Sequence, residues 1–113
     1  MAAERMKREE LLEIHDELAA KARALMVKKN HDYAGAKGQQ PFANFERVEA
    51  MGVCSTEKGL LVRLIDKVSR LSSFADSGTF EVEDESLEDT VIDVMNYAVL
   101  ILAFHRDKQH GHG

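Results

Sequence analysis

The most informative stretch of the chain is residues 91–104, which are apolar at nearly every position except Asp93 and Asn96. At ~100° per residue on a helix, Asp89, Asp93 and Asn96 fall within one narrow arc. The opposite side carries apolar residues: Val91, Val94, Ala98, Ile101 and Leu102. A helix that is apolar nearly all round is normally buried by its neighbours. Because a buried carboxylate is costly without a partner, the sequence predicts cations, hydrogen-bond donors or a metal ion beside Asp89 and Asp93.

The rest of the pattern predicts two further long helices and one short helix. Apolar residues recur at three- and four-residue steps over residues 4–29 and again over 56–75, where Ser55 is a suitable N-cap. The helix over 56–75 has one apolar face: Leu61, Leu64, Ile65, Val68 and Leu71. A short helix over 42–51 ends at Gly52, and Ser86 begins the third long helix with Asp89 in a capping-box position. The predicted fold class is all-α, a helical bundle in a single domain, 1–113, with frayed ends at 1–5 and 106–113.

Composition narrows the range of functions. A chain of 113 residues makes one small domain with a modest core, so a homo-oligomer, a dimer or a tetramer, is expected to extend that core. The net charge of −5 argues against direct DNA or RNA binding, which needs a basic surface. The single cysteine, Cys54, forms no intramolecular disulfide and fits a cytoplasmic location. The longest apolar run is too short for a membrane span, and the charged start has no signal-peptide pattern.

Two stripes of charged residues, one acidic and one mostly basic, are candidates for ligand binding or catalysis. Asp89 and Asp93 are four residues apart, so their carboxylates project side by side and are able to share Mg²⁺. The alternative is that Asp89 is a capping residue and Asp93 makes a buried ion pair. A second stripe on the helix over 56–75 offers cations for phosphates and one more carboxylate: Arg63, Asp66, Lys67 and Arg70. Its alternative is the solvated face of an amphipathic helix. A short connection makes these two helices antiparallel neighbours.

A third group lies where the first helix ends and the following loop begins. It combines donors, acceptors and an aromatic ring that are suited to reading a base or a ribose: Lys29, His31, Asp32, Tyr33 and Asn44. The alternative is a helix terminus followed by a surface loop.

Four motifs occur in order and together resemble a known family. They are Lys-Asn-His-Asp-Tyr at 29–33, Pro-Phe-Ala-Asn-Phe at 41–45, Arg-Leu-Ile-Asp-Lys-Val-Ser-Arg at 63–70 and Glu-Asp-Thr-Val-Ile-Asp-Val-Met-Asn-Tyr at 88–97. Over about residues 20 to 104 the chain resembles the nucleotide modification associated domain 1 family, which is found largely in phages. That family is similar to the all-α nucleoside triphosphate pyrophosphohydrolases of the MazG and dimeric dUTPase group.

The resemblance implies a Mg²⁺-dependent site that cleaves a nucleoside triphosphate to a monophosphate and pyrophosphate. The group's pattern is Glu-x-x-Glu on one helix and Glu-x-x-Asp on the next. On the second helix of this pattern, Asp93 matches the final Asp, whereas Thr90 stands at the Glu position and Asp89 lies one residue before it. On the first helix, Arg63 and Asp66 stand at the two Glu positions.

By this resemblance the expected metal ligands are Asp66, Asp89 and Asp93, of which Asp66 and Asp93 would be catalytic together with Lys67. The expected nucleotide contacts are Lys67, Arg70, Arg63, Asn96, Tyr33, His31, Asp32, Asn44 and Lys29. Two alternatives stay open, a module that binds nucleotides without hydrolysis and a structural helical oligomer.

Overall fold

The structure is a computed structural model that describes residues 4–34, 40–82 and 85–111, with residues 31–34 described by their backbone alone. The described residues form four helices and no strand: α1 (Arg8–Ala34), α2 (Ala43–Ala50), α3 (Thr56–Ser77) and α4 (Leu87–Gln109). The predicted all-α class, with three long helices and one short helix, is therefore confirmed. No helix in the described part of the chain is both long enough and apolar enough to cross a membrane.

Local sequence chemistry sets the starts of α3 and α4. The Ser55 hydroxyl accepts a hydrogen bond from the Lys58 N–H at the start of α3. At the start of α4, the Ser86 hydroxyl accepts from the Asp89 N–H, and the Asp89 carboxylate accepts from the Ser86 N–H. These contacts satisfy N–H groups that have no partner within the helix, so the predicted caps are confirmed.

Helices α1 and α4 have other bounds than predicted. Helix α1 begins at Arg8 rather than at residue 4 and continues to Ala34, past the predicted end at residue 29. Helix α4 continues to Gln109, so residues 106–109 are helical rather than frayed. The Lys108 ammonium contributes to this continuation, because it pairs with Glu57 at 2.9 Å and lies over the Phe104 ring.

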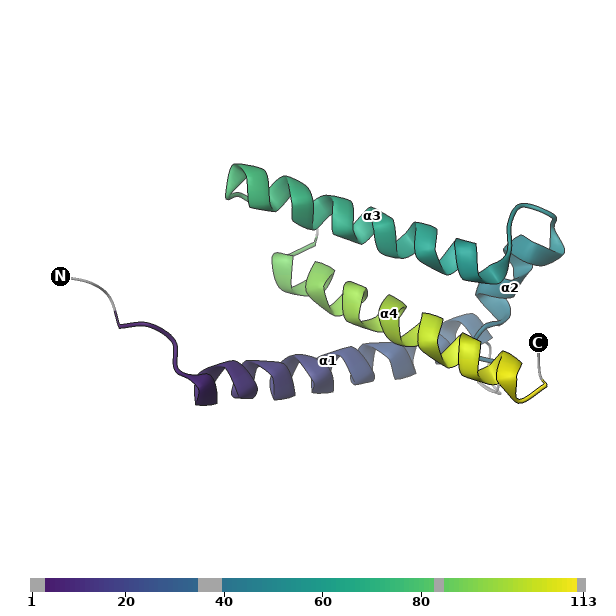
Figure 1. Ribbon diagram of the computed structural model, residues 1–113, viewed down its shortest axis with the longest axis horizontal. Coiled ribbons are helices and arrows are strands. Elements are labelled where there is room, and N and C mark those ends of the chain that lie inside the picture. The colour runs from purple at the N-terminus through teal and green to yellow at the C-terminus, as the bar shows by residue number, and fades with distance from the viewer. Residues whose placement is uncertain (1–3, 35–39, 83–84, 112–113) are drawn as a thin grey trace.

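Helices α3 and α4 run antiparallel and side by side, and α1 lies along the other side of α4 (Figure 1). The buried core is small and lies at the end of the bundle that α2 covers. Its members are Phe42, Phe45, Leu60 and Phe104, with Tyr97, Leu100, Ile101 and Ala103 packed against them. Phe42 and Phe104 meet edge to face, with ring centroids 5.2 Å apart. The core therefore fixes the positions of α2, α3 and α4 around one cluster of rings.

The prediction that α4 is buried on nearly every side is wrong. Helix α4 is not covered on every side, because Val99 is 54% exposed and Leu102 is 49% exposed. On α3 the apolar face points outward, with Ile65 56% exposed, whereas the face that carries Lys67 packs toward α4. A single chain therefore leaves much of its apolar surface exposed.

Candidate functional site

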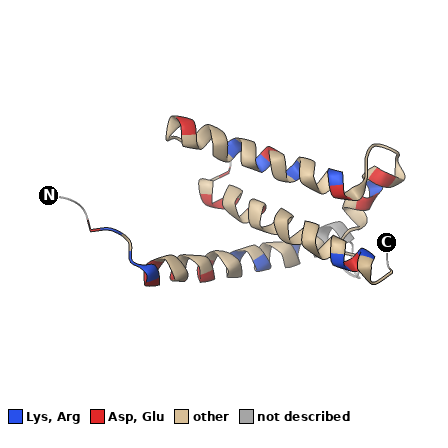
Figure 2. Cartoon of the chain, viewed as in Figure 1, with Lys and Arg blue, Asp and Glu red and all other residues tan. Residues whose placement is uncertain are grey.

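A cluster of charged side chains joins α3 to α4 and to the segment that leads into α4. Lys67 is at its centre, and its Nζ lies 2.9 Å from a Glu85 oxygen and 2.9 Å from an Asp93 oxygen. The Lys67 side chain is only 14% exposed, and Figure 2 shows the basic residues of α3 in the middle of that helix. Burial alone would lower the pKa of Lys67, but hydrogen bonds to Glu85 and Asp93 outweigh burial and raise that pKa above 10.5.

Glu85 is the most heavily bonded carboxylate of the cluster. It accepts hydrogen bonds from the Lys67 ammonium, from Arg70 Nη1 at 2.8 Å and from the buried Thr90 hydroxyl. Burial by itself would raise the pKa of Glu85, whereas these three donors lower that pKa from 4.5 to about 2. Glu85 is therefore ionised throughout the physiological range, and it holds the middle of α3 against the start of α4.

Asp93 lies inward, as its arc on the helix predicts, and is 9% exposed. One of its oxygens pairs with Lys67 and the other lies 3.7 Å from Lys29 Nζ on α1. The Asp93 carboxylate thus has a cation from each neighbouring long helix. This pairing is the alternative that the sequence offered for Asp93.

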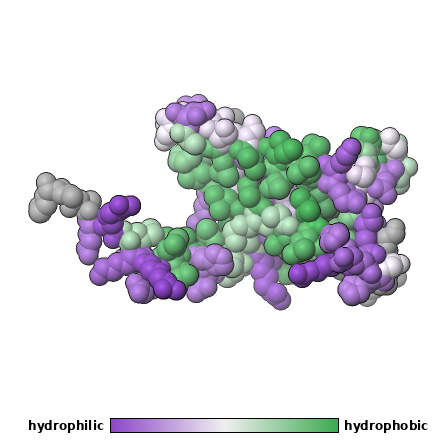
Figure 3. All heavy atoms as spheres, viewed as in Figure 1, coloured by the Kyte–Doolittle hydropathy of each residue, from purple (hydrophilic) through white to green (hydrophobic). Residues whose placement is uncertain are grey.

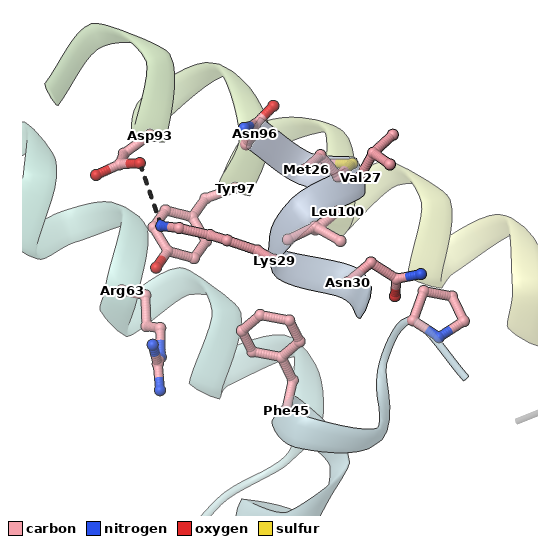
Figure 4. A pocket seen from close by; sticks show the side chains of 11 residues that line it. Met26, Val27, Lys29, Asn30, Phe45, Arg63, Asp93, Asn96, Tyr97 and Leu100 are labelled. Atoms are coloured by element: carbon pink, nitrogen blue, oxygen red, sulfur yellow. Dashed lines mark ion pairs between the residues drawn. The ribbon is translucent and has the colours of Figure 1, made fainter. Parts of the chain in front are cut away.

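Beside Asp93 there is a pocket of about 230 Å³ that all four helices and the segment before α2 enclose. Its lining combines apolar, aromatic and polar side chains: Met26, Val27, Lys29, Asn30, Pro41, Phe45, Arg63, Asp93, Asn96, Tyr97 and Leu100. Figure 4 shows the Phe45 ring on the α2 side and the Tyr97 ring on the α4 side, with the Lys29 side chain extending toward Asp93. An apolar pocket with a few polar groups is the usual form of a small-molecule site.

Of the two described cations that line the pocket, Lys29 and Arg63, Arg63 has the greater freedom to meet a ligand. Its guanidinium lies 5.5 Å from the centre of the Phe45 ring, and its side chain is exposed on α3. Among the described residues no carboxylate forms an ion pair with Arg63, whereas Lys67 and Arg70 each have two. The pocket therefore has a positive group at its edge that is not already neutralised by a described carboxylate.

The structure brings four of the predicted site residues into this pocket: Lys29, Arg63, Asp93 and Asn96. Lys67 adjoins the pocket through Asp93. The Asn96 amide donates a hydrogen bond to the Ala22 carbonyl at 3.0 Å, so it also ties α4 to α1.

Other predicted residues lie apart from the pocket lining. Asp66 is 61% exposed and pairs with Arg70 along α3. Asn44 accepts a hydrogen bond from Arg47 on α2. Asp89 was expected to face inward with Asp93, but it is exposed at the first turn of α4, where its carboxylate closes the capping box. Hydrogen bonds from the Ser86 N–H and hydroxyl lower the pKa of Asp89. The side chains of His31, Asp32 and Tyr33 lie outside the described part of the structure.

The three predicted magnesium ligands all have other partners. Asp93 has two lysines, Asp66 has Arg70, and Asp89 has the Ser86 N–H. Within the described residues, no three His, Cys, Asp or Glu side chains gather closely enough to hold a metal ion. The carboxylates as they stand do not fit Mg²⁺, because each would have to exchange a present partner for the ion. A magnesium site stays a prediction of the family resemblance, and no chemical step is derived from it.

Comparisons with known protein families, with curated proteins and with solved structures found no match for this chain.

Two important features were missed by sequence reasoning. Phe45 and Tyr97 supply the rings of the pocket, and both fall within the motifs that carry the family resemblance, so the motifs were a usable signal. No motif or helical spacing pointed to Glu85, because it lies in the acidic connection just before the Ser86 cap and belongs to neither helix.

Proposed function

We propose that the pocket beside Asp93 binds a nucleotide or a closely related phosphate-bearing small molecule. The observation that supports this most directly is the combination of two aromatic rings, Phe45 and Tyr97, with Arg63, which pairs with no carboxylate in the described part of the chain. Aromatic rings suit a base, because every base has a face that stacks. An arginine fork suits a phosphate, because it makes two parallel hydrogen bonds.

The size of the pocket supports a division of the ligand into two parts. A volume of about 230 Å³ is below the usual range of about 300 to 1,000 Å³ for a small-molecule pocket, so part of a nucleotide would extend out of it. The phosphates would extend past Arg63 and Lys29, which is 42% exposed at the pocket edge. The apolar walls formed by Met26, Val27 and Leu100 would cover the remaining face of the base.

The ion pairs favour a protein that binds nucleotides without hydrolysing them. Asp93 and Asp66, the two carboxylates that the family resemblance implies to be catalytic, are each paired with cations. This is the arrangement expected of a module that sequesters or senses nucleotides. The family resemblance adds hydrolysis to monophosphate and pyrophosphate as a second candidate, together with a phage origin. A phage-encoded protein of this kind would meet its ligand in the host cytoplasm.

A panel of nucleoside mono-, di- and triphosphates tests the proposal by thermal shift, with and without Mg²⁺, alongside a pyrophosphate assay. A ligand at 100 times its Kd stabilises the folded chain by about 2.7 kcal/mol, which is easily detected as a rise in Tm. Arg63→Gln is expected to weaken binding by about 10-fold or more, because a charged hydrogen bond to phosphate is lost.

Arg23→Gln is the matched control, since Arg23 is exposed on α1 and does not line the pocket. Stabilisation by a nucleotide that Arg63→Gln weakens and Arg23→Gln preserves supports binding at this pocket. Pyrophosphate release that is lost in Asp93→Asn, with the helical circular dichroism spectrum retained, supports the hydrolytic candidate. A chain that no nucleotide stabilises, or one in which both arginine variants bind equally well, refutes the proposal.

A further inference from the structure

One oxygen of the Asp93 carboxylate is able to accept a further hydrogen bond. Oδ2 lies 2.9 Å from the Lys67 ammonium, whereas Oδ1 lies 3.7 Å from Lys29 Nζ, which is beyond hydrogen-bond distance. No other residue in the described part of the chain donates to Oδ1. Asp93 is only 9% exposed and lines the pocket. A ligand that brings a donor to this oxygen therefore satisfies a buried group that the described residues satisfy only in part.

The charges around Asp93 decide which kind of donor fits. The ammonium groups of Lys67 and Lys29 already lie beside its two oxygens, and Arg63 lines the same pocket. A cationic group of a ligand would be repelled by these cations. A neutral N–H group meets no such repulsion, and its hydrogen bond is strong because the acceptor is ionised. The pocket therefore favours a neutral donor.

The position of Tyr97 indicates which part of a nucleotide brings that donor. Tyr97 follows Asp93 by four residues, about one turn of α4, so both side chains lie on the same side of the helix. Figure 4 shows both beside the end of the Lys29 side chain. In Figure 3 the visible face of α3 and α4 is largely hydrophobic, so it offers few groups that recognise a base edge. A base that stacks on the Tyr97 ring, by contrast, presents its edge to Asp93.

The bases differ in what they present at that edge. Cytosine, adenine and guanine carry an exocyclic amino group that projects from the ring, and a carboxylate is a suitable acceptor for such a group. Uracil carries carbonyl oxygens instead, and its ring N–H lies between them, so a carbonyl oxygen would face the acceptors of the pocket. Asn96 strengthens this preference, because its amide nitrogen donates to the Ala22 carbonyl and no described residue donates to its oxygen.

We propose that the pocket selects nucleotides whose base carries an exocyclic amino group, and that Asp93 Oδ1 accepts a hydrogen bond from that group. This inference rests on the nucleotide binding proposed above and adds the identity of the base. The Lys29 side chain, which is 42% exposed, then turns from Asp93 toward the phosphates. Asp93 becomes the residue that determines specificity, whereas Arg63 binds the charge that all nucleotides share.

Isothermal titration calorimetry with two matched pairs of ligands tests the inference. Cytidine and uridine monophosphate carry an amino group and a carbonyl, respectively, at the same ring position, as do adenosine and inosine monophosphate. In at least one pair the amino member is expected to bind at least about 10-fold more tightly, because the other member places a carbonyl oxygen against a buried ionised acceptor. Deoxycytidine monophosphate is expected to bind as cytidine monophosphate does, whereas a donor on the ribose would separate these two ligands instead.

Asp93→Asn keeps the shape of the side chain and replaces one acceptor by a donor. The ratio of the two dissociation constants within the pair is expected to fall from about 10 or more to about 1. A residue that held only a metal ion or the fold would weaken both members alike and leave the ratio unchanged. Asp76→Asn is the matched control, because Asp76 is exposed near the end of α3 and does not line the pocket.

An amino preference that Asp93→Asn abolishes and Asp76→Asn keeps supports the inference. Equal binding within both pairs, or a ratio that Asp93→Asn leaves unchanged, overturns the selection of the base and leaves nucleotide binding standing. A chain that binds no nucleotide overturns both proposals. Circular dichroism reports whether the variants fold, and the comparison of bases in the wild-type chain tests the inference without them.

Discussion

Glu85→Gln is the substitution that tests the charged cluster most directly. Glutamine keeps the shape of the side chain and an oxygen that accepts a hydrogen bond, but it removes the negative charge that Lys67 and Arg70 share. The Glu85 side chain is 17% exposed, so water screens these contacts only in part. The fall in the pKa of Glu85 from 4.5 to about 2 corresponds to about 3 kcal/mol of stabilisation of the folded state at neutral pH.

The sign of the pH dependence follows from the direction of that change. The folded chain holds the Glu85 carboxylate at a lower pKa than the unfolded chain does, so its contribution is fully present above pH 4.5. The contribution is lost as the pH falls from about 4.5 through 2, where the folded state also takes up the proton. The wild-type chain and Glu85→Gln are therefore expected to differ by about 2 to 3 kcal/mol in free energy of unfolding at pH 7, and by progressively less below pH 4.5.

Urea unfolding followed by circular dichroism, repeated between pH 7 and pH 2.5 at one protein concentration, measures this difference. Glu81→Gln is the control, because Glu81 is exposed in the same connection between α3 and α4. Its free energy of unfolding is expected to follow the wild-type value at every pH. A Glu85→Gln deficit that is the same at pH 7 and pH 2.5, or one below about 0.5 kcal/mol at pH 7, would refute the reasoning.

Three further substitutions address the caps, the core and the pocket. Ser86→Ala removes the hydroxyl that caps α4 and is expected to lower the free energy of unfolding by about 1 kcal/mol in urea titrations. Leu60→Ala empties a fully buried core position and is expected to cost about 2 to 5 kcal/mol. Leu61→Ala is the control, because Leu61 is 46% exposed, and its free energy of unfolding is expected to fall far less at low protein concentration. Equal losses in the two variants would contradict the burial of Leu60. Arg63→Gln is expected to leave the Tm of the chain without ligand nearly unchanged and to reduce only the rise in Tm that a nucleotide produces.

Local chemistry is what made parts of this fold predictable. Ser55 and Ser86 precede helices because their hydroxyls accept hydrogen bonds from the first turn, which requires no knowledge of the rest of the molecule. The inward position of Asp93 follows from the helical period together with the apolar residues around it. The pairing of Asp93 with Lys67 then follows from the antiparallel arrangement that a short connection imposes.

The exposure of apolar residues on α3 was not predictable in the same way. The stripe with Lys67 was expected to meet the carboxylates of the next helix, and the chain buries that side because Glu85 and Asp93 compensate the Lys67 charge. Leu61, Ile65 and Val68 are left exposed as a result. Glu85 acquires its role only through tertiary structure, since it lies outside both helices that it joins. The pocket likewise forms only where segments far apart in the sequence come together. The motifs that contain Phe45 and Tyr97 were therefore the only indication in the sequence that these rings line a site.

The central position of Lys67 has a consequence for the register of the two long antiparallel helices. Apolar side chains tolerate sliding past one another, because one methyl group replaces another at little cost. A slide of α3 along α4 by one turn, about 5.4 Å, would separate Lys67 from Glu85 and Asp93 together, and both carboxylates would lose their 2.9 Å contacts with its ammonium. The cluster thus selects one alignment from several that the apolar contacts alone would allow.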